Sequence, residues 1–227
     1  SEFLNKMSHE FRTPLGIIYG FAEVMSDDAK QGNPTNETCV EEILSGASRL
    51  NDLIEQLFNM AELDKSSYKL FFESVSPRDL SENIGQYMDA KISENENSFV
   101  VDITNAPETF ETDKIKYQQI IINFLSNAAK FTNQGKITFT VRQDKIENKE
   151  VVISEVVDTG IGMPADRINE IFREFHQLDN TFTREYEGSG VGLSISLKLA
   201  KLLGGEIKVF STPKKGSCFQ LILPKKA

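Results

Sequence analysis

The chain has 227 residues, 39% hydrophobic and 26% charged, a composition typical of one or two folded globular domains. Its 34 acidic and 25 basic residues leave a net charge of -9, the wrong sign for a protein held by phosphate contacts, so we expect no nucleic acid partner. No stretch is apolar for the roughly 18 residues that a membrane span needs. The two cysteines, Cys39 and Cys218, lie far apart and predict neither a disulfide framework nor a zinc site.

Residues 1–65 predict an antiparallel helical hairpin, because apolar side chains recur every seven residues in both halves. These side chains are Leu4, Phe11, Ile18 and Met25 in the first half and Val40, Ala47, Ile54 and Ala61 in the second, with Ile43, Leu50 and Leu57 interleaved. The break at 31–34 separates the helices, and Thr35 or Asn36 can cap the second one. The apolar stripe is longer than one hairpin can cover, which predicts a homodimeric four-helix bundle.

His9 falls on the side of the first helix that faces away from this stripe. If Leu4 and Phe11 are a positions, His9 lies at an f position, about 140° around the helix. A lone histidine in a helix is otherwise as often a packed core residue, but the heptad phase argues for exposure here. An exposed imidazole is mostly neutral at pH 7 and can therefore act as a nucleophile.

After a linker at 66–76, residues 77–227 predict a separate α+β domain. Strand-like runs are expected at 99–103, 136–141, 151–157, 206–210 and 218–223, and helical patterns at about 78–92, 114–131 and 193–203. This order is not a regular alternation of strand and helix. We therefore expect an α/β sandwich with the helices on one face of a mixed sheet, and not a doubly wound fold.

Asn123, Asn127 and Lys130 share one face of the expected helix at 114–131. Amide oxygens can ligate a Mg²⁺ ion that keeps several waters, and a lysine can contact phosphate. Polar residues on a solvated helix face have the same spacing. From these residues alone, both interpretations stay open.

Asp158 ends the apolar run 151–157 and is followed by Gly160 and Gly162. Glycines allow a planar ligand to approach the backbone closely, and the carboxylate can accept a hydrogen bond from an exocyclic amine. A tight turn after the strand explains the same pattern equally well.

Gly188, Gly190 and Gly192 form a second glycine-rich segment, which runs into an apolar helix. Bare N–H groups at a helix N-terminus can bind phosphate. A dinucleotide-binding fold is disfavoured because the preceding residues 183–187 are polar and do not form a strand pattern. A Walker loop is excluded because Gly-Lys-[Ser/Thr] does not occur.

Five segments resemble the sequence boxes of sensor histidine kinases, in the order of that family. They are the H-box Ser8-His9-Glu10-Phe11-Arg12-Thr13-Pro14-Leu15, the N-box 123–132, the G1 box 158–162, the F-box 172–175 and the G2 box 188–193. The resemblance spans nearly the whole chain and extends to kinases of the hybrid type. It implies a dimerisation and phosphotransfer hairpin, followed by an ATP-binding domain with the fold of type II topoisomerases and the large heat-shock chaperone.

The resemblance also implies a role for each matching residue. His9 would accept the phosphoryl group of ATP, Glu10 would act as its acid/base partner, and Thr13 would orient water in a phosphatase reaction. The implied ATP site consists of Asn123, Asn127, Lys130, Asp158, Gly160, Gly162, Arg184, Gly188, Gly190 and Gly192, with Mg²⁺ on Asn127 and adenine on Asp158. The implied partner is an aspartate of a response regulator receiver domain. The implied location is cytoplasmic, with membrane attachment only through parts of the parent protein outside this chain.

Two other functional classes are less consistent with these residues. An ATP-hydrolysing clamp of the related superfamily would carry a glutamate four residues before the metal-binding asparagine, where this chain has Asn123, and an amide cannot act as a general base. A catalytically dead kinase that serves as a dimeric scaffold is disfavoured because every box residue that the chemistry needs is present. We therefore expect ATP-dependent phosphorylation of His9.

Overall fold

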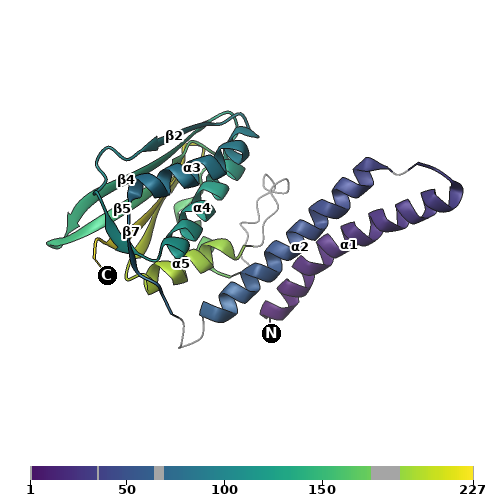
Figure 1. Cartoon of the computed structure of the whole chain (residues 1–227), viewed down its shortest axis with the longest axis horizontal. Coiled ribbons are helices and arrows are strands. Elements are labelled where there is room, and N and C mark those ends of the chain that lie inside the picture. Colours follow the sequence, from purple (N-terminus) through teal and green to yellow (C-terminus); the bar gives the residue numbers. More distant parts are fainter. Residues whose placement is uncertain (1, 35, 64–68, 175–189, 227) are drawn as a thin grey trace. The chain divides into compact units, whose positions relative to one another are not determined.

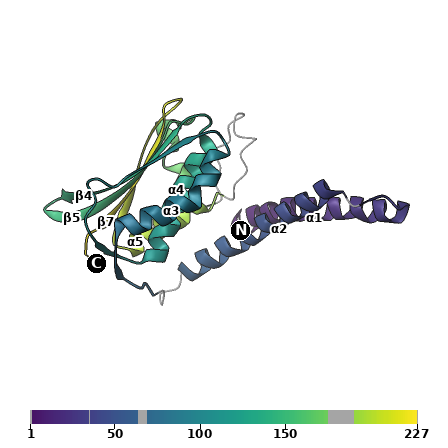
Figure 2. The ribbon, with the colours of Figure 1, turned by 45° about the horizontal axis from the view of Figure 1, so that its top comes forward.

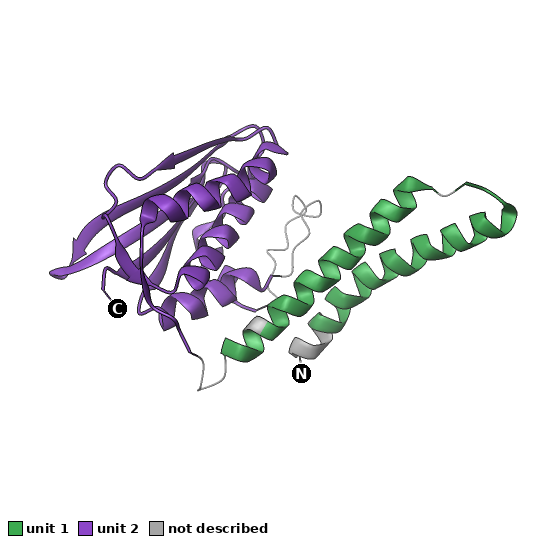
Figure 3. Ribbon diagram, in the orientation of Figure 1, with its two compact units in different colours: residues 1–66 green, residues 67–227 purple. Residues whose placement is uncertain are grey.

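The computed structural model describes residues 2–34, 36–63, 69–174 and 190–226, and it divides into two compact units (Figure 3). Unit 1 comprises residues 1–66 and unit 2 residues 67–227. Within the described residues, no helix is both long and apolar enough to cross a membrane.

Unit 1 is the expected hairpin of two long helices, α1 (Glu2–Gln31) and α2 (Glu37–Leu63), which pack side by side (Figure 1). Asn36 caps α2, since its Oδ1 accepts a hydrogen bond of 3.0 Å from the N–H of Thr38. Pro14 lies inside α1 without ending it. Thr35, the other cap that the sequence allowed, lies outside the described residues.

The heptad positions of α2 divide into a covered and an uncovered set. Ile43, Leu50 and Leu57 are half-buried in the hairpin, whereas Ala47, Ile54 and Ala61 are exposed, Ile54 by 40%. The other large apolar side chains that the hairpin exposes are Leu15, Tyr19, Val24, Leu44 and Phe58. The first set therefore joins α1 to α2. Of the second set, Val40 is half-buried, and Ala47, Ile54 and Ala61 have no cover among the residues that the structure describes.

Unit 2 is built on a five-stranded mixed sheet in the order β2-β4-β5-β7-β6. Its strands are β2 (Ser98–Asp102), β4 (Lys136–Ile146), β5 (Lys149–Asp158), β6 (Glu206–Thr212) and β7 (Gly216–Pro224). The pair β2–β4 is parallel, and the other neighbouring pairs are antiparallel. The expected mixed sheet is confirmed.

Three helices cover one face of this sheet, as the views in Figure 1 and Figure 2 agree: α3 (Pro77–Ser93), α4 (Lys114–Phe131) and α5 (Gly192–Leu202). Asp113 caps α4 by accepting from the N–H of Lys116 at 3.1 Å. The core between α4 and the sheet contains a polar link, because the hydroxyl groups of Tyr117 and Ser154 hydrogen-bond at 2.7 Å while fully buried. The expected two-layer sandwich is confirmed.

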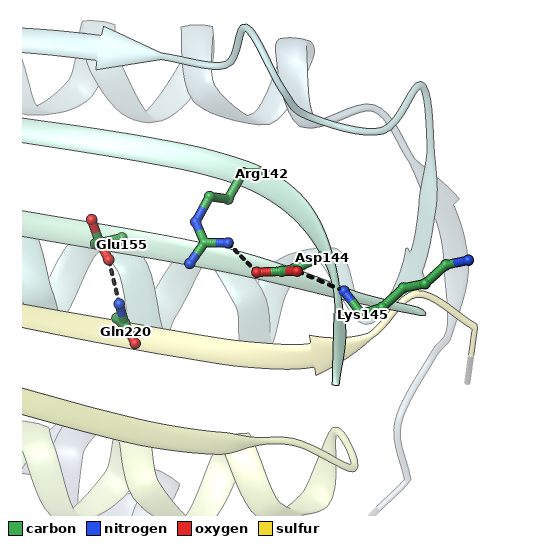
Figure 4. Close-up of polar contacts among 5 residues, drawn as sticks. All are labelled: Arg142, Asp144, Lys145, Glu155 and Gln220. Atoms are coloured by element: carbon green, nitrogen blue, oxygen red, sulfur yellow. Dashed lines mark hydrogen bonds and ion pairs between the residues drawn. The ribbon is translucent and has the colours of Figure 1, made fainter. Parts of the chain in front are cut away.

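The opposite face of the sheet is mixed: a small apolar cluster of Val151, Ile153 and Ile222 is buried there, and polar side chains lie beside it on the same strands. On β5, Val156 points to the helices and is buried, whereas the adjacent Glu155 is half-buried on the other face. Figure 4 shows Glu155 paired with Gln220 of the neighbouring strand, and Arg142 paired with Asp144. These side chains pair with one another on the face that none of the described helices covers (Figure 1).

A second, two-stranded sheet was not predicted from the sequence. In it β1 (Glu73–Val75) pairs antiparallel with β3 (Phe110–Thr112). β1 lies within the stretch 66–76 that the sequence analysis treated as a linker. Strands of three residues are too short to show an alternating pattern, so only the pairing partner identifies them.

Candidate active site

His9 is exposed on α1, as its heptad position predicts, and Glu10 beside it is half-buried. Burial raises the pKa of the Glu10 carboxyl group, and electrostatic interactions with Arg49 and with the neighbouring His9 partly oppose that rise. The Thr13 hydroxyl donates to the backbone carbonyl of His9 at 3.4 Å, one turn away. Arg49, on α2, was missed by the sequence analysis, because nothing in the spacing of one helix shows which residue of the next helix faces it.

Asp158 lies at the end of β5, where it is only 6% exposed. Its Oδ1 accepts a hydrogen bond of 2.8 Å from the N–H of Gly160. Burial raises the pKa of the carboxyl group, while the N–H groups of Gly160 and Ser217 and the nearby Thr132 hydroxyl lower it. A carboxylate is a costly group to bury, which makes Asp158 a candidate for ligand binding.

Thr132, directly after α4, brings a second buried polar group to Asp158. Its hydroxyl is close enough to stabilise the carboxylate, but it makes no well-formed hydrogen bond with a described residue. A buried hydroxyl without a proper partner is rare and costs free energy, so such groups commonly serve a ligand or a bound water. Thr132 is the last residue of the N-box, and its spacing alone did not predict a role beside Asp158.

Gly160 and Gly162 are required by the chain's own packing. A Cβ atom on Gly160 would lie 2.2 Å from the carbonyl oxygen of Phe131. A Cβ atom on Gly162, which has φ +60°, would lie 2.0 Å from the carbonyl oxygen of Thr212. Gly160 therefore lets the segment after β5 lie against the end of α4, and Gly162 lets it lie against the end of β6, whether or not either glycine also contacts a ligand.

The polar face of α4 contains two asparagines with different environments. The Nδ2 of Asn123 donates to the hydroxyl of Ser196 on α5 at 2.8 Å. Asn127 is half-buried, and its amide has no hydrogen-bond partner in the part of the chain that the structure describes. The Nζ of Lys130 lies 4.8 Å from the centroid of the Phe131 ring. Asn127 is thus the amide that is available to a ligand.

The glycine-rich segment is described only from Gly190 onward. Gly190 has φ +66°, and Gly192 is the first residue of α5. A Cβ atom on Gly192 would lie 2.4 Å from the Oδ1 of Asn123, so the N-terminus of α5 is in direct contact with α4. Gly188 and Arg184, two of the predicted ATP contacts, lie outside the described residues.

The predicted residues therefore gather along one helix. Asp158 and Thr132 lie at the C-terminal end of α4, and Asn123 with Gly192 lies near its middle. Nine residues separate Thr132 from Asn123, which corresponds to about 13 Å along a helix. Among the described residues, no three His, Cys, Asp or Glu side chains are grouped to hold a metal, so an ion here would need amide oxygens and oxygens of the ligand itself.

Known proteins share both units. Residues 112–227, just over half of the chain, match the family described as histidine kinase-, DNA gyrase B-, and HSP90-like ATPase. Residues 1–66 match the His Kinase A (phospho-acceptor) domain.

Two curated relatives align with almost all of the chain. Hybrid signal transduction histidine kinase B of Dictyostelium discoideum is 32% identical, over 98% of this chain and 11% of that protein. Autoinducer 2 sensor kinase/phosphatase LuxQ of Vibrio parahaemolyticus is 30% identical, over 100% of this chain and 26% of that protein. The chain thus spans only a small part of the length of these relatives.

A solved structure shares the fold of the whole chain. The histidine kinase ThkA, in a complex with the response regulator protein TrrA, superposes with a TM-score of 0.74 at 25% identity, over 99% of this chain and 61% of that one. The two matched domains occur in the order that the five sequence boxes predict. The chain therefore belongs to the sensor histidine kinases and comprises the phospho-acceptor hairpin and ATPase domain that form their catalytic core.

Proposed function

We propose that this chain transfers the γ-phosphoryl group of ATP to His9 and then to an aspartate of a response regulator receiver domain. The observation that carries the proposal is the pairing of an exposed His9 with the half-buried carboxylate of Glu10. An exposed imidazole can reach a phosphoryl donor, and the adjacent carboxylate can take up its proton. Domain matches at 1–66 and 112–227 support the same reaction.

In the first step, a ring nitrogen of His9 attacks the γ-phosphorus. A phosphorus–nitrogen bond forms, the bond to the bridging β,γ oxygen breaks, and ADP leaves with that oxygen. Glu10 stabilises or accepts the proton of the imidazole as its positive charge develops. Because such a transfer needs mainly positioning and charge neutralisation, the nucleotide site does most of the remaining work.

Asp158 would bind adenine by accepting from its amino group, with the Thr132 hydroxyl beside it. The two groups fit this role because both are buried and the hydroxyl lacks a well-formed partner. The N–H groups of the glycine-rich segment, including Gly190 and Gly192, would bind the phosphates, with Gly188 and Arg184 as further contacts. Asn127 would ligate Mg²⁺ through its amide oxygen, which has no partner among the described residues, with Asn123 and Lys130 nearby on the same helix. When bound, the ion would neutralise negative charge on the triphosphate.

The response regulator is proposed on chemical grounds and by analogy. A phosphohistidine is a good phosphoryl donor to a carboxylate, and ThkA was solved with a response regulator. Thr13, one turn from His9, would serve a phosphatase reaction toward the regulator, and LuxQ is named as a kinase and phosphatase. Both substrates, ATP and the regulator, place the reaction in the cytoplasm.

The chain would act as a homodimer through α1 and α2. Ala47, Ile54 and Ala61 form an exposed stripe at seven-residue spacing, and Phe58 beside them is 71% exposed. A second copy could cover this stripe by packing its own α1 and α2 against it in a four-helix bundle.

The direct test is phosphate labelling of the purified chain with radiolabelled Mg²⁺–ATP. The wild type should acquire phosphate that is labile in acid and stable in alkali, and it should lose the label to a receiver domain. His9→Gln should acquire no label while it binds an ATP analogue as tightly as the wild type. Labelling that survives acid, or that persists in His9→Gln, would overturn the proposal.

A further inference from the structure

Two buried serines of α5, Ser194 and Ser196, have matching local bonds but differ in what they contact on other elements. The Ser194 hydroxyl donates to the carbonyl of Val191 at 2.7 Å, and the Ser196 hydroxyl donates to the carbonyl of Gly192 at 3.0 Å. Among the described residues, only Ser196 of the two also bonds to α4, because its oxygen accepts a hydrogen bond of 2.8 Å from the Nδ2 of Asn123. A chain of hydrogen bonds thus runs from Asn123 through Ser196 to Gly192.

This series of hydrogen bonds determines which way the side-chain amide of Asn123 faces. A serine hydroxyl has one hydrogen, and here it is donated to the Gly192 carbonyl. Toward Asn123 the hydroxyl therefore presents a lone pair, which selects the amide nitrogen as its partner. The amide oxygen must then face the other way.

The oxygen faces the start of α5. The Oδ1 of Asn123 lies 2.4 Å from the point where a Cβ atom on Gly192 would be, so a Cα hydrogen of the glycine is directed at it. Such a Cα–H contact is weakly favourable for an oxygen and would be unfavourable for an N–H group. The hydrogen bond from the amide nitrogen to Ser196 and the contact of the amide oxygen with Gly192 therefore indicate the same orientation of the Asn123 side chain.

We propose that Ser196 is a positioning residue for nucleotide binding, which keeps the Asn123 oxygen turned toward the glycine-rich segment. The proposal rests on the proposed function, in which that segment binds the phosphates. A Mg²⁺ ion that keeps several waters presents hydrogen-bond donors to its surroundings. An amide oxygen can accept from those waters, whereas an amide nitrogen in the same place would repel them.

Ser196→Ala removes the lone pair that orients the amide, so Asn123 can turn by half a rotation and present its nitrogen. Ser194→Ala is the matched control: it has the same substitution, helix and buried setting, and it loses an equivalent bond to a backbone carbonyl. Ser196→Thr keeps the hydroxyl and serves as the conservative variant. None of these changes alters a residue that is proposed to contact ATP.

The measurement is the affinity for a non-hydrolysable ATP analogue by calorimetry, with Mg²⁺ and again with a chelator. The ratio of the two affinities reports the contribution of the ion. Ser196→Ala should lower this ratio about fivefold, the effect of one hydrogen bond of typical net strength. Ser194→Ala and Ser196→Thr should stay within about twofold of the wild type on the same scale.

A double variant completes the test. Once Asn123→Ala has removed the amide, adding Ser196→Ala should lower the ratio no further, because Ser196 acts through Asn123. The wild type must bind the Mg²⁺ complex of the analogue tightly. If it does, and the affinity ratios of Ser194→Ala and Ser196→Ala are equal, the positioning role is overturned and the proposed function remains intact. A wild type that binds the analogue equally with and without Mg²⁺ would overturn both.

Discussion

The carboxylate of Asp158 accepts a hydrogen bond of 2.8 Å from the N–H of Gly160, two residues further along the chain. This bond holds a buried acid at the end of β5, and burial still raises the pKa of that acid above its ordinary value. The relationship has measurable consequences for stability and for binding.

The stability of unit 2 should depend on pH through Asp158. The pKa of Asp158 is higher in the folded protein than in the unfolded chain, where it is about 3.9. The contribution of Asp158 to the free energy of unfolding is therefore fully present below about pH 3.9, and it is lost as the pH rises through the pKa of the folded protein. Ionised Asp158 therefore costs stability at neutral pH. In thermal melts of the nucleotide-free protein, the melting temperature of Asp158→Asn should rise relative to that of the wild type as the pH increases from about 4 to about 7. A difference that stays constant across this range would contradict the raised pKa.

The same variant should bind ATP more weakly. An amide can present a donor where the carboxylate only accepts, and a hydrogen bond to a charged group contributes about 1.5–3 kcal/mol, so the affinity should fall roughly tenfold to a hundredfold. Asp144→Asn, on the opposite face of the sheet, is the control and should bind normally. Calorimetric titration checks both, and unchanged affinity in Asp158→Asn would refute the adenine contact.

Arg49 should tune the pH dependence of autophosphorylation. Burial raises the pKa of Glu10, and the positive charge of Arg49 lowers it. Because Arg49→Ala removes that charge, the pKa of Glu10 should rise further in this variant. Since Glu10 must be ionised to take the proton of His9, the acidic limb of the rate profile should move to higher pH. Arg49→Lys keeps the charge and should move it less. The profile is measured as initial labelling rate against pH, and coincident limbs for all three proteins would rule out this role.

Ile54 should be essential to the homodimer. Ile54→Lys places a charge in the apolar stripe that a second copy is proposed to cover, where it would lie unpaired. Sedimentation at tens of micromolar is expected to show a dimer for the wild type and a monomer for the variant. Asp52→Asn changes the net charge by the same amount at an exposed position of α2 outside the stripe, and it should stay dimeric. A monomeric wild type would refute the bundle.

Asn127 should bind Mg²⁺ rather than merely face solvent. Asn127→Ala deletes the ligand, and Asn127→Asp puts a carboxylate beside the phosphates, so both should lose phosphotransfer. Nucleotide binding by Asn127→Ala should become less dependent on Mg²⁺, while its melting temperature changes little, because alanine is the better helix former. Gln119→Ala, two turns earlier on α4, is the control. An active, normally Mg²⁺-dependent Asn127→Ala would show that this helix face is only solvated.

Local patterns in the sequence predicted most of the elements and the main site residues. The hairpin follows from seven-residue spacing, and the strands and helices of unit 2 follow from runs such as 151–157 and 114–131. Such patterns are readable because burial on one side of an element repeats with the period of that element. The exposure of His9 is predicted in the same way, from its phase on α1 alone.

The contacts between elements were decided only by the tertiary structure. β1 and β3 are too short for a pattern and exist because they pair with each other. From the sequence, the glycines after Asp158 could either give a ligand space or form a tight turn. The structure shows that position 160 must be glycine because a Cβ atom there would collide with the carbonyl oxygen of Phe131. Ser196 looks like an ordinary helical residue until α5 lies against α4 and its oxygen meets Asn123. The spacing of residues along a helix or strand determines which side chains share one face of that element. The residues that they contact on a neighbouring element depend on how the two elements pack, and the sequence pattern of one element does not contain that information.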